Sequence, residues 1–94
     1  MDENEFIATG RRKEAIARIQ LILSDKPDII INHKELNKYF TRDDLKAIVK
    51  QPLLLTKTMD KLKIIANVTG GGIKGQAEAI RHGISRALVI FNQA

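Results

Sequence analysis

The stretch from Gly70 to Leu88 constrains the fold of this chain most, because three consecutive glycines lead directly into an amphipathic segment. Consecutive glycines form a turn that adopts positive φ without strain and brings backbone N–H groups close to another molecule. A helix that begins there adds its own free N–H groups and the positive end of its dipole. The junction is therefore suited to an anion such as a phosphate.

The helix expected after this turn has one apolar face that belongs in the core. Lys74 and Arg81 are seven residues apart and lie nearly on one line beside this face, whereas His82 and Arg86 point further round the helix. The apolar residues recur at helical spacing, at Ile73, Ala77, Ile80, Ile84, Leu88 and Phe91.

A second stripe of the same helix carries almost no side chain. Gly75, Ala79 and Gly83 form it at a spacing of four residues. A glycine inside a helix costs roughly 1 kcal/mol relative to alanine, so the stripe needs an explanation. Two explanations are open: a sugar-phosphate strand lies against the stripe, or another part of the protein packs there.

Two nucleotide-binding motifs fit the glycines only in part. Gly70, Gly72 and Gly75 match G-x-G-x-x-G, but that motif needs an acidic residue about 20 positions later, and no Asp or Glu follows Glu78. Gly70 and Gly75 also have the spacing of a phosphate-binding loop, in which a lysine should follow. This chain has Gln76 there. A plain strand-to-helix turn also remains open.

The overall composition predicts one small globular domain. The chain has 94 residues, of which 44% are hydrophobic and 29% charged. It has no cysteine, and His33 and His82 have no ligating neighbours in the sequence, so we expect neither a metal nor a cofactor. The acidic start at residues 1–5 lacks the pattern of a signal peptide. No apolar run approaches transmembrane length, so we expect a cytoplasmic protein without a membrane partner.

The net charge of +5 is concentrated in two segments. Four basic residues stand against Glu14 in residues 9–24, and four stand against Glu78 in residues 62–94. These segments contain the two glycine-bearing loops, a distribution typical of nucleic-acid binding. The basic residues are Arg11, Arg12, Lys13, Arg18, Lys63, Lys74, Arg81 and Arg86.

The N-terminal third predicts a hairpin with a basic tip. Residues 6–8 and 15–23 are its strands, and Gly10 to Lys13 form the loop between them. Alternate residues from Ala15 to Leu23 face inward, which leaves Arg18 and Gln20 facing out. A turn over residues 24–28 then leads to a third strand over residues 29–31. We expect these three strands to be antiparallel.

Two capping patterns predict short helices in the middle of the chain. Asn32 is followed by Glu35, and Thr41 by Asp44, at the spacing of a capping box. Pro52 should end the second helix, because the residue before a proline disfavours helical angles. The helices are expected over residues 36–40 and 42–50, either a strand or an extended segment over 53–55, and a strand over 63–68. The core residues expected here are Tyr39, Phe40, Leu45, Ile48 and Val49.

Several motifs then occur in a fixed order along the chain. They are Thr9–Lys13 followed by Ala15–Arg18, then Gln51–Leu53, Gly70–Ile73 with Gly75 and Gln76, Ala79–Ile84 and Arg86–Leu88. Together they resemble the small-subunit ribosomal protein S-nine family of bacterial type over residues 6–88. The resemblance implies an α+β fold, a two-layer β-α-β sandwich like the second domain of ribosomal protein S-five, with a left-handed crossover. Sequence spacing alone could not show that hand, because such crossovers are generally right-handed.

The resemblance also implies a function. It implies a single non-enzymatic domain over residues 1–94, a structural constituent of the small ribosomal subunit that binds rRNA in the subunit head beside other ribosomal proteins. Family members continue into a long Lys/Arg-rich tail that reaches the tRNA in the peptidyl site. The sequence ends at Ala94, so we expect the tRNA contact to involve only that absent tail.

The rRNA-binding residues that the resemblance and the charge distribution imply are of two kinds. Basic side chains would pair with phosphates, and glycines would let backbone N–H groups approach the RNA. The set is Gly10, Arg11, Arg12, Lys13, Arg18, Gly70, Gly71, Gly72, Lys74, Gly75, Gln76, Arg81, His82 and Arg86. One alternative is a nucleotide-phosphate-binding enzyme of the same fold that uses the Gly70–Gly75 turn. Another is a protein-binding module that uses the small-residue stripe.

Overall fold

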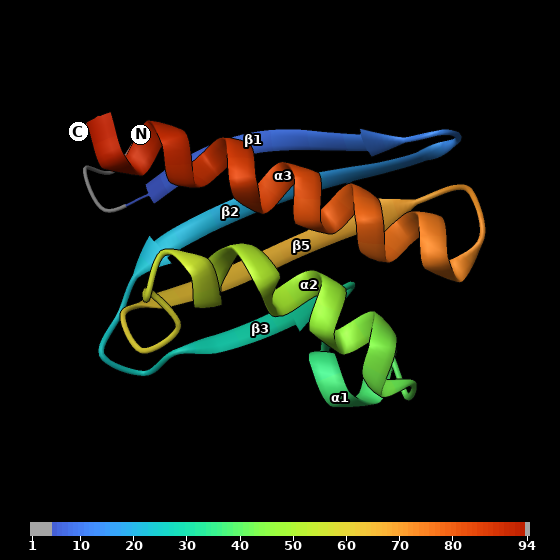
Figure 1. Ribbon diagram of the computed structural model, residues 1–94, viewed down its shortest axis with the longest axis horizontal. Helices are drawn as coiled ribbons and strands as arrows, with labels where there is room; N and C mark the ends of the chain where they lie inside the picture. Colours follow the sequence, from blue (N-terminus) through green and yellow to red (C-terminus); the bar gives the residue numbers. More distant parts are fainter. Residues whose placement is uncertain (1–4, 94) are drawn as a thin grey trace.

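The computed structural model describes residues 5–93 and shows two layers, a five-stranded mixed sheet and helices on one of its faces (Figure 1). The strand order is β1-β2-β5-β3-β4. The acidic residues 1–4 and Ala94 lie outside the described part. The elements are β1 (Glu5–Arg12), β2 (Ala15–Leu23), β3 (Asp28–Ile31), β4 (Lys34–Glu35), α1 (Leu36–Tyr39), α2 (Asp43–Leu55), β5 (Leu62–Thr69) and α3 (Ile73–Gln93).

The predicted hairpin is confirmed, but its loop is shorter than expected. β1 pairs antiparallel with β2 up to the pair Arg12–Ala15, so only Lys13 and Glu14 form the turn. Lys13 has a φ of 56°, which a two-residue hairpin turn requires. The expected loop over Gly10–Lys13 was therefore wrong for its first three residues, because their backbones continue the ladder with β2.

The third strand does not continue the antiparallel sheet. β3 pairs with β5 in parallel, and β5 lies between β2 and β3. In Figure 1 the helices face the viewer, β3 and β5 run in the same direction, and α2 crosses in front of the sheet between them. Because β5 lies above β3 when both strands point to the right, the crossover is left-handed. The expected hand is confirmed, and the expected antiparallel arrangement of β3 was wrong.

The segment after β3 also differs from its prediction. Asn32 and His33 have φ values of 49° and 70° and form the turn between β3 and β4. Asn32 therefore does not cap a helix. The cap position of α1 is Glu35, which makes no side-chain capping bond. Asn32 instead forms hydrogen bonds through its side-chain amide with the backbone of Val68, a partner that no local pattern could reveal.

The start of α2 is capped differently from the capping-box prediction. Arg42 is the N-cap residue, and it makes no side-chain hydrogen bond to the helix backbone. Its Nη2 atom donates to Oδ2 of Asp44 over 2.7 Å, and its Nε donates to Oδ1 over 3.1 Å. These hydrogen bonds lower the pKa of Asp44 below its ordinary value. Thr41 was thus wrongly assigned as the cap.

Pro52 does not end α2, which continues to Leu55. Pro52 and Leu53 are both buried, so packing on the core stabilises the last turn against the lost backbone hydrogen bond. The hydroxyl of Thr56 donates to the carbonyl oxygen of Pro52 over 2.9 Å and helps to close the helix. The extended segment expected over residues 53–55 is therefore helical.

α3 packs across β1 and β2 through the stripe of small residues (Figure 1). Gly83 lies against Gly10 of β1, and a Cβ on Gly10 would overlap the carbonyl oxygen of Ala79 and the backbone nitrogen of Gly83. A Cβ on Gly83 would overlap the side chain of Ile19. Of the two explanations for the stripe, the structure shows protein packing. Ala79 and Gly83 are buried and present no groove to a nucleic acid.

Most of the expected core is confirmed, with exceptions at the ends of elements. The side chains of Ile73 and Leu23 are 48% and 40% exposed. Tyr39 and Ile48 are only partly buried against the core. Phe91 packs edge-on against Phe6 with ring centroids 5.4 Å apart. None of the described helices combines the length and hydropathy needed to cross a bilayer.

Gly10→Ala should lower the free energy of unfolding by about 1–3 kcal/mol, because the added methyl group forces the backbones of β1 and α3 apart. Urea denaturation of the 94-residue chain measures this change. Gly72→Ala is the matched control, because a Cβ there meets no atom of residues 5–93 within 4 Å. Equal stability of the two variants would contradict the close contact between Gly10 and α3.

Candidate nucleic-acid interface

The β1–β2 turn and the glycine turn lie side by side at one end of the domain (Figure 1). Pairing of Ile16 with Thr69 brings the end of β5 beside the start of β2. Gly70 has a φ of 76°, and a Cβ there would overlap the carbonyl oxygen of Glu14. The two basic segments, far apart in the sequence, therefore meet.

Residues of both turns line one hollow, which we call the turn hollow. Basic side chains and glycine backbone surround it, since Arg12, Lys13, Lys74, Gly71 and Gly72 all line it. The first backbone N–H groups of α3 have no acceptor within the helix and lie at the same place. The remaining lining residues are Glu14, Ile73, Gly75 and Glu78.

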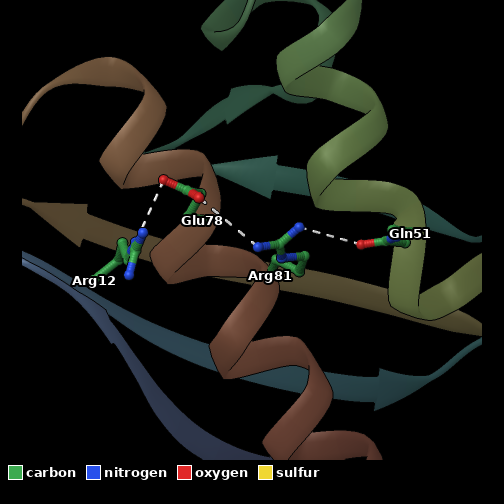
Figure 2. A network of polar contacts seen from close by, with 4 residues as sticks. All are labelled: Arg12, Gln51, Glu78 and Arg81. Carbon is green, nitrogen blue, oxygen red and sulfur yellow. Dashed lines mark hydrogen bonds and ion pairs between the residues drawn. The ribbon is translucent and has the colours of Figure 1, made fainter.

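A second hollow, which we call the helix groove, lies between α2, α3 and the end of β1. It is lined by Arg11, Arg12, Gln51, Glu78, Arg81, His82 and Ser85. Figure 2 shows its polar network, in which Glu78 lies between Arg12 and Arg81. Nε of Arg12 is 3.6 Å from Oε1 of Glu78, and Nη2 of Arg81 is 3.8 Å from Oε2. Arg81 also donates through Nη1 to Oε1 of Gln51 over 3.2 Å.

His82 and Arg86 cover the free edge of β1. The N–H group of Arg11 donates to Nδ1 of His82 over 3.0 Å, and Nη1 of Arg86 donates to the carbonyl oxygen of Thr9 over 2.8 Å. β1 is an edge strand, so these backbone groups have no strand partner on that side. Because Nδ1 accepts this bond, the proton of the neutral ring is on Nε2 of the exposed side chain.

Gln76 supports the glycine turn from inside. Tyr39 donates its hydroxyl hydrogen to Oε1 of Gln76 over 2.7 Å, and Nε2 of Gln76 donates to the carbonyl oxygen of Gly70 over 3.1 Å. Asn32 donates to the Tyr39 hydroxyl over 3.3 Å and binds both backbone groups of Val68. This chain of hydrogen bonds ties the glycine turn to the β3–β4 turn, α1 and β5.

The structure brings together most of the predicted site residues, but not all of them. Arg18 lies on the face of the sheet opposite α3, paired across the strands with Thr9 and Asn67. Gly10 is buried beneath α3 and does not line the surface. The residues that line the turn hollow or the helix groove are Arg11, Arg12, Lys13, Gly71, Gly72, Lys74, Gly75, Arg81 and His82. Gly70, Gln76 and Arg86 border them through the hydrogen bonds described above.

Sequence reasoning missed the polar partners of these cations. Glu78 precedes Arg81 by three residues, a helical ion-pair spacing that was visible in the sequence. Gln51 stood in one of the family motifs but had no assigned role. Tyr39 and Asn32, which support the glycine turn, had no local signal either, because their partners Gln76 and Val68 lie 37 and 36 residues away.

No three His, Asp or Glu side chains gather closely enough within residues 5–93 to hold a metal ion. The two histidines are on different elements, since His33 is in the β3–β4 turn and His82 is in α3. His33 is thus a turn residue.

The architecture defines a small α+β domain with one cationic end. The sequence profile of the family described as Ribosomal protein S9/S16 matches residues 10–94, and the chain belongs to this family. It is therefore a structural protein of the small ribosomal subunit and not an enzyme. Family membership excludes the alternative of a nucleotide-binding enzyme built on the Gly70–Gly75 turn.

Tyr39→Phe should shift the backbone amide NMR signals of Gly70, Gly71 and Gly72 and lower the free energy of unfolding by about 1 kcal/mol, because Gln76 loses its hydroxyl partner. Ser24→Ala is the control, since it deletes a hydroxyl that accepts a hydrogen bond from the Lys26 N–H at the other end of the domain. Unchanged glycine signals in Tyr39→Phe would show that Gln76 holds the turn without Tyr39.

Proposed function

We propose that this chain binds rRNA in the head of the small ribosomal subunit through its cationic end, formed by the turn hollow and the helix groove. The observation that supports this proposal is the meeting of the two basic segments. The β2–β5 pairing places the Lys13 turn beside the glycine turn and the start of α3. Family membership in the small subunit makes rRNA the natural polyanion for this surface.

The cationic end would act mainly on the phosphate backbone. Arg12, Lys13 and Lys74 surround the turn hollow with exposed side chains that can pair with phosphates. The backbone of Gly72 is open, since a Cβ there would meet no atom within 4 Å. Contacts of this kind position a protein on RNA, and specificity then depends largely on the shape of the RNA.

Base stacking on aromatic rings plays no part in this proposal. Stacking needs exposed rings, and the aromatic side chains pack against one another. Phe6 contacts Phe91, and Tyr39 contacts Phe40 with ring centroids 4.9 Å apart. Phe40 is fully buried, and the Tyr39 hydroxyl is engaged with Gln76.

Other ribosomal proteins of the head are proposed partners for surfaces away from the cationic end. Any contact with tRNA is proposed to lie in the basic tail that the family resemblance implies and that residues 1–94 do not include. Arg18 is not part of the proposed rRNA surface, because its side chain lies on the face of the sheet opposite α3.

The test is the affinity of the chain for a head rRNA fragment across a salt series, with an unrelated structured RNA of equal length in parallel. Binding that is selective for the fragment and falls steeply with salt supports the proposal. Equal and weak binding to both RNAs would contradict it. Selective binding without a salt slope would contradict the assignment of phosphate contacts to the cationic end.

Replacing Arg12, Lys13 and Lys74 together by glutamine should reduce the log–log salt slope by about three units, roughly one for each phosphate that no longer has a cationic partner. Affinity for the head fragment should fall accordingly at low salt.

The matched control replaces Lys26, Lys57 and Lys61 by glutamine. This variant loses the same charge. Its three lysines belong to the β2–β3 and α2–β5 connections, which lie at the end of the domain away from the two turns (Figure 1). Its salt slope should stay close to that of the unchanged chain. Equal slopes for the two triple variants would show that only net charge matters and that the cationic end is not the site.

A further inference from the structure

Glu78 is an acidic residue at the centre of a cationic surface. It is the only Asp or Glu of α3, and none follows it in the sequence. Its side chain is 19% exposed, less than those of the two arginines that flank it. Electrostatic attraction of RNA alone would disfavour a carboxylate at this place, so its presence points to another role.

Glu78 contacts cations from two different elements (Figure 2). Arg12 reaches it from the end of β1 over 3.6 Å, and Arg81 reaches it from the next turn of α3 over 3.8 Å. Both distances exceed the usual range of about 2.7–3.2 Å for a hydrogen bond. The guanidinium groups are therefore oriented by charge. Among the described residues, the Arg81 bond to Gln51 is the only hydrogen bond that these two groups donate.

Glu78 and Arg12 also separate the two hollows. Both residues line the turn hollow and the helix groove, and no other residue between 5 and 93 lines both. A phosphate on either side can meet a guanidinium, whereas a phosphate directly over Glu78 meets a carboxylate. The carboxylate thus divides the cationic surface into two places for phosphates.

We propose that Glu78 is a specificity-determining positioning residue. It orients Arg12 and Arg81 toward two separate phosphate positions of a folded RNA and repels backbones that would cross between them. An RNA of the right shape places its phosphates only in the two hollows. Its phosphates then pair with both arginines and stay away from the Glu78 carboxylate. This inference rests on the proposed rRNA binding and adds to it a basis for discrimination between RNAs.

The first test is Glu78→Gln, measured against the head rRNA fragment and the unrelated structured RNA at one fixed salt concentration. We expect affinity for the unrelated RNA to rise about threefold and affinity for the fragment to fall about threefold, so selectivity falls about tenfold. A merely structural role would instead lower the affinity for both RNAs together and leave their ratio unchanged, which would overturn the proposal.

Glu14→Gln is the matched control for charge. Glu14 also lines the turn hollow, but it forms no ion pair within residues 5–93. Removing its charge should raise the affinity for both RNAs by a similar factor and preserve their ratio. A loss of selectivity as large as that of Glu78→Gln would show that local charge, and not the position of Arg12 and Arg81, is responsible.

Glu78→Asp separates position from charge, because it keeps the carboxylate but withdraws it from both arginines by one methylene group. We expect it to lose selectivity at an unchanged salt slope, and circular dichroism establishes that each variant is folded. Selectivity equal to that of the unchanged chain would overturn the proposal for Glu78. Absence of selectivity in the unchanged chain would instead overturn the proposed rRNA binding, so the two failures are distinguishable.

Discussion

The direct contact between the backbones of Gly10 and Gly83 is the interaction on which the rest of the structure depends. With no side chain on either residue, α3 lies close enough to β1 to bury Ala79 and to fill the core with Ile80 and Ile84. The same close approach brings His82 and Arg86 within reach of the free backbone groups of β1. It also sets Glu78 opposite Arg12, so the position of α3 determines the geometry of the helix groove.

Polar residues near the cationic end have two different roles. Some hold the backbone in place through hydrogen bonds, and others are exposed on the surface. Gln76 and Arg86 look like ligand contacts in the sequence, yet each bonds to a backbone carbonyl, of Gly70 and Thr9 respectively. Backbone groups at turns and sheet edges need such partners, because an unpaired polar group in a shielded place is costly. The exposed side chains of Lys13 and Lys74 therefore lie near backbone groups that these hydrogen bonds hold in place.

The ion pairs of this surface contribute little to the stability of the fold. Exposed pairs such as Arg12 with Glu78 contribute roughly 0–1 kcal/mol to folding, so stability alone is a weak reason for their presence. Their effect on the direction of the guanidinium groups does not require strong pairing. A surface with cations alone would attract any polyanion, whereas one with a carboxylate between two arginines can favour one path of an RNA backbone.

Local sequence patterns determined which segments are helix or strand and which residues carry charge. The period of residues 73–91 predicted α3, and the alternation from Ala15 predicted β2. The two basic segments predicted an anion-binding site at the glycine-bearing loops, which stays a prediction. Local rules failed where a distant partner outweighed them. Pro52 stays inside α2 because the core covers it, and Asn32 leaves its predicted cap because Val68 binds its amide. Only the tertiary structure decided four other features. They are the parallel placement of β3 beside β5, the burial of Gly10, the position of Arg18 on the open sheet face and the Arg12–Glu78–Arg81 arrangement. Each depends on contacts between residues that are far apart in the sequence. Local sequence patterns carry no information about the energies of such contacts.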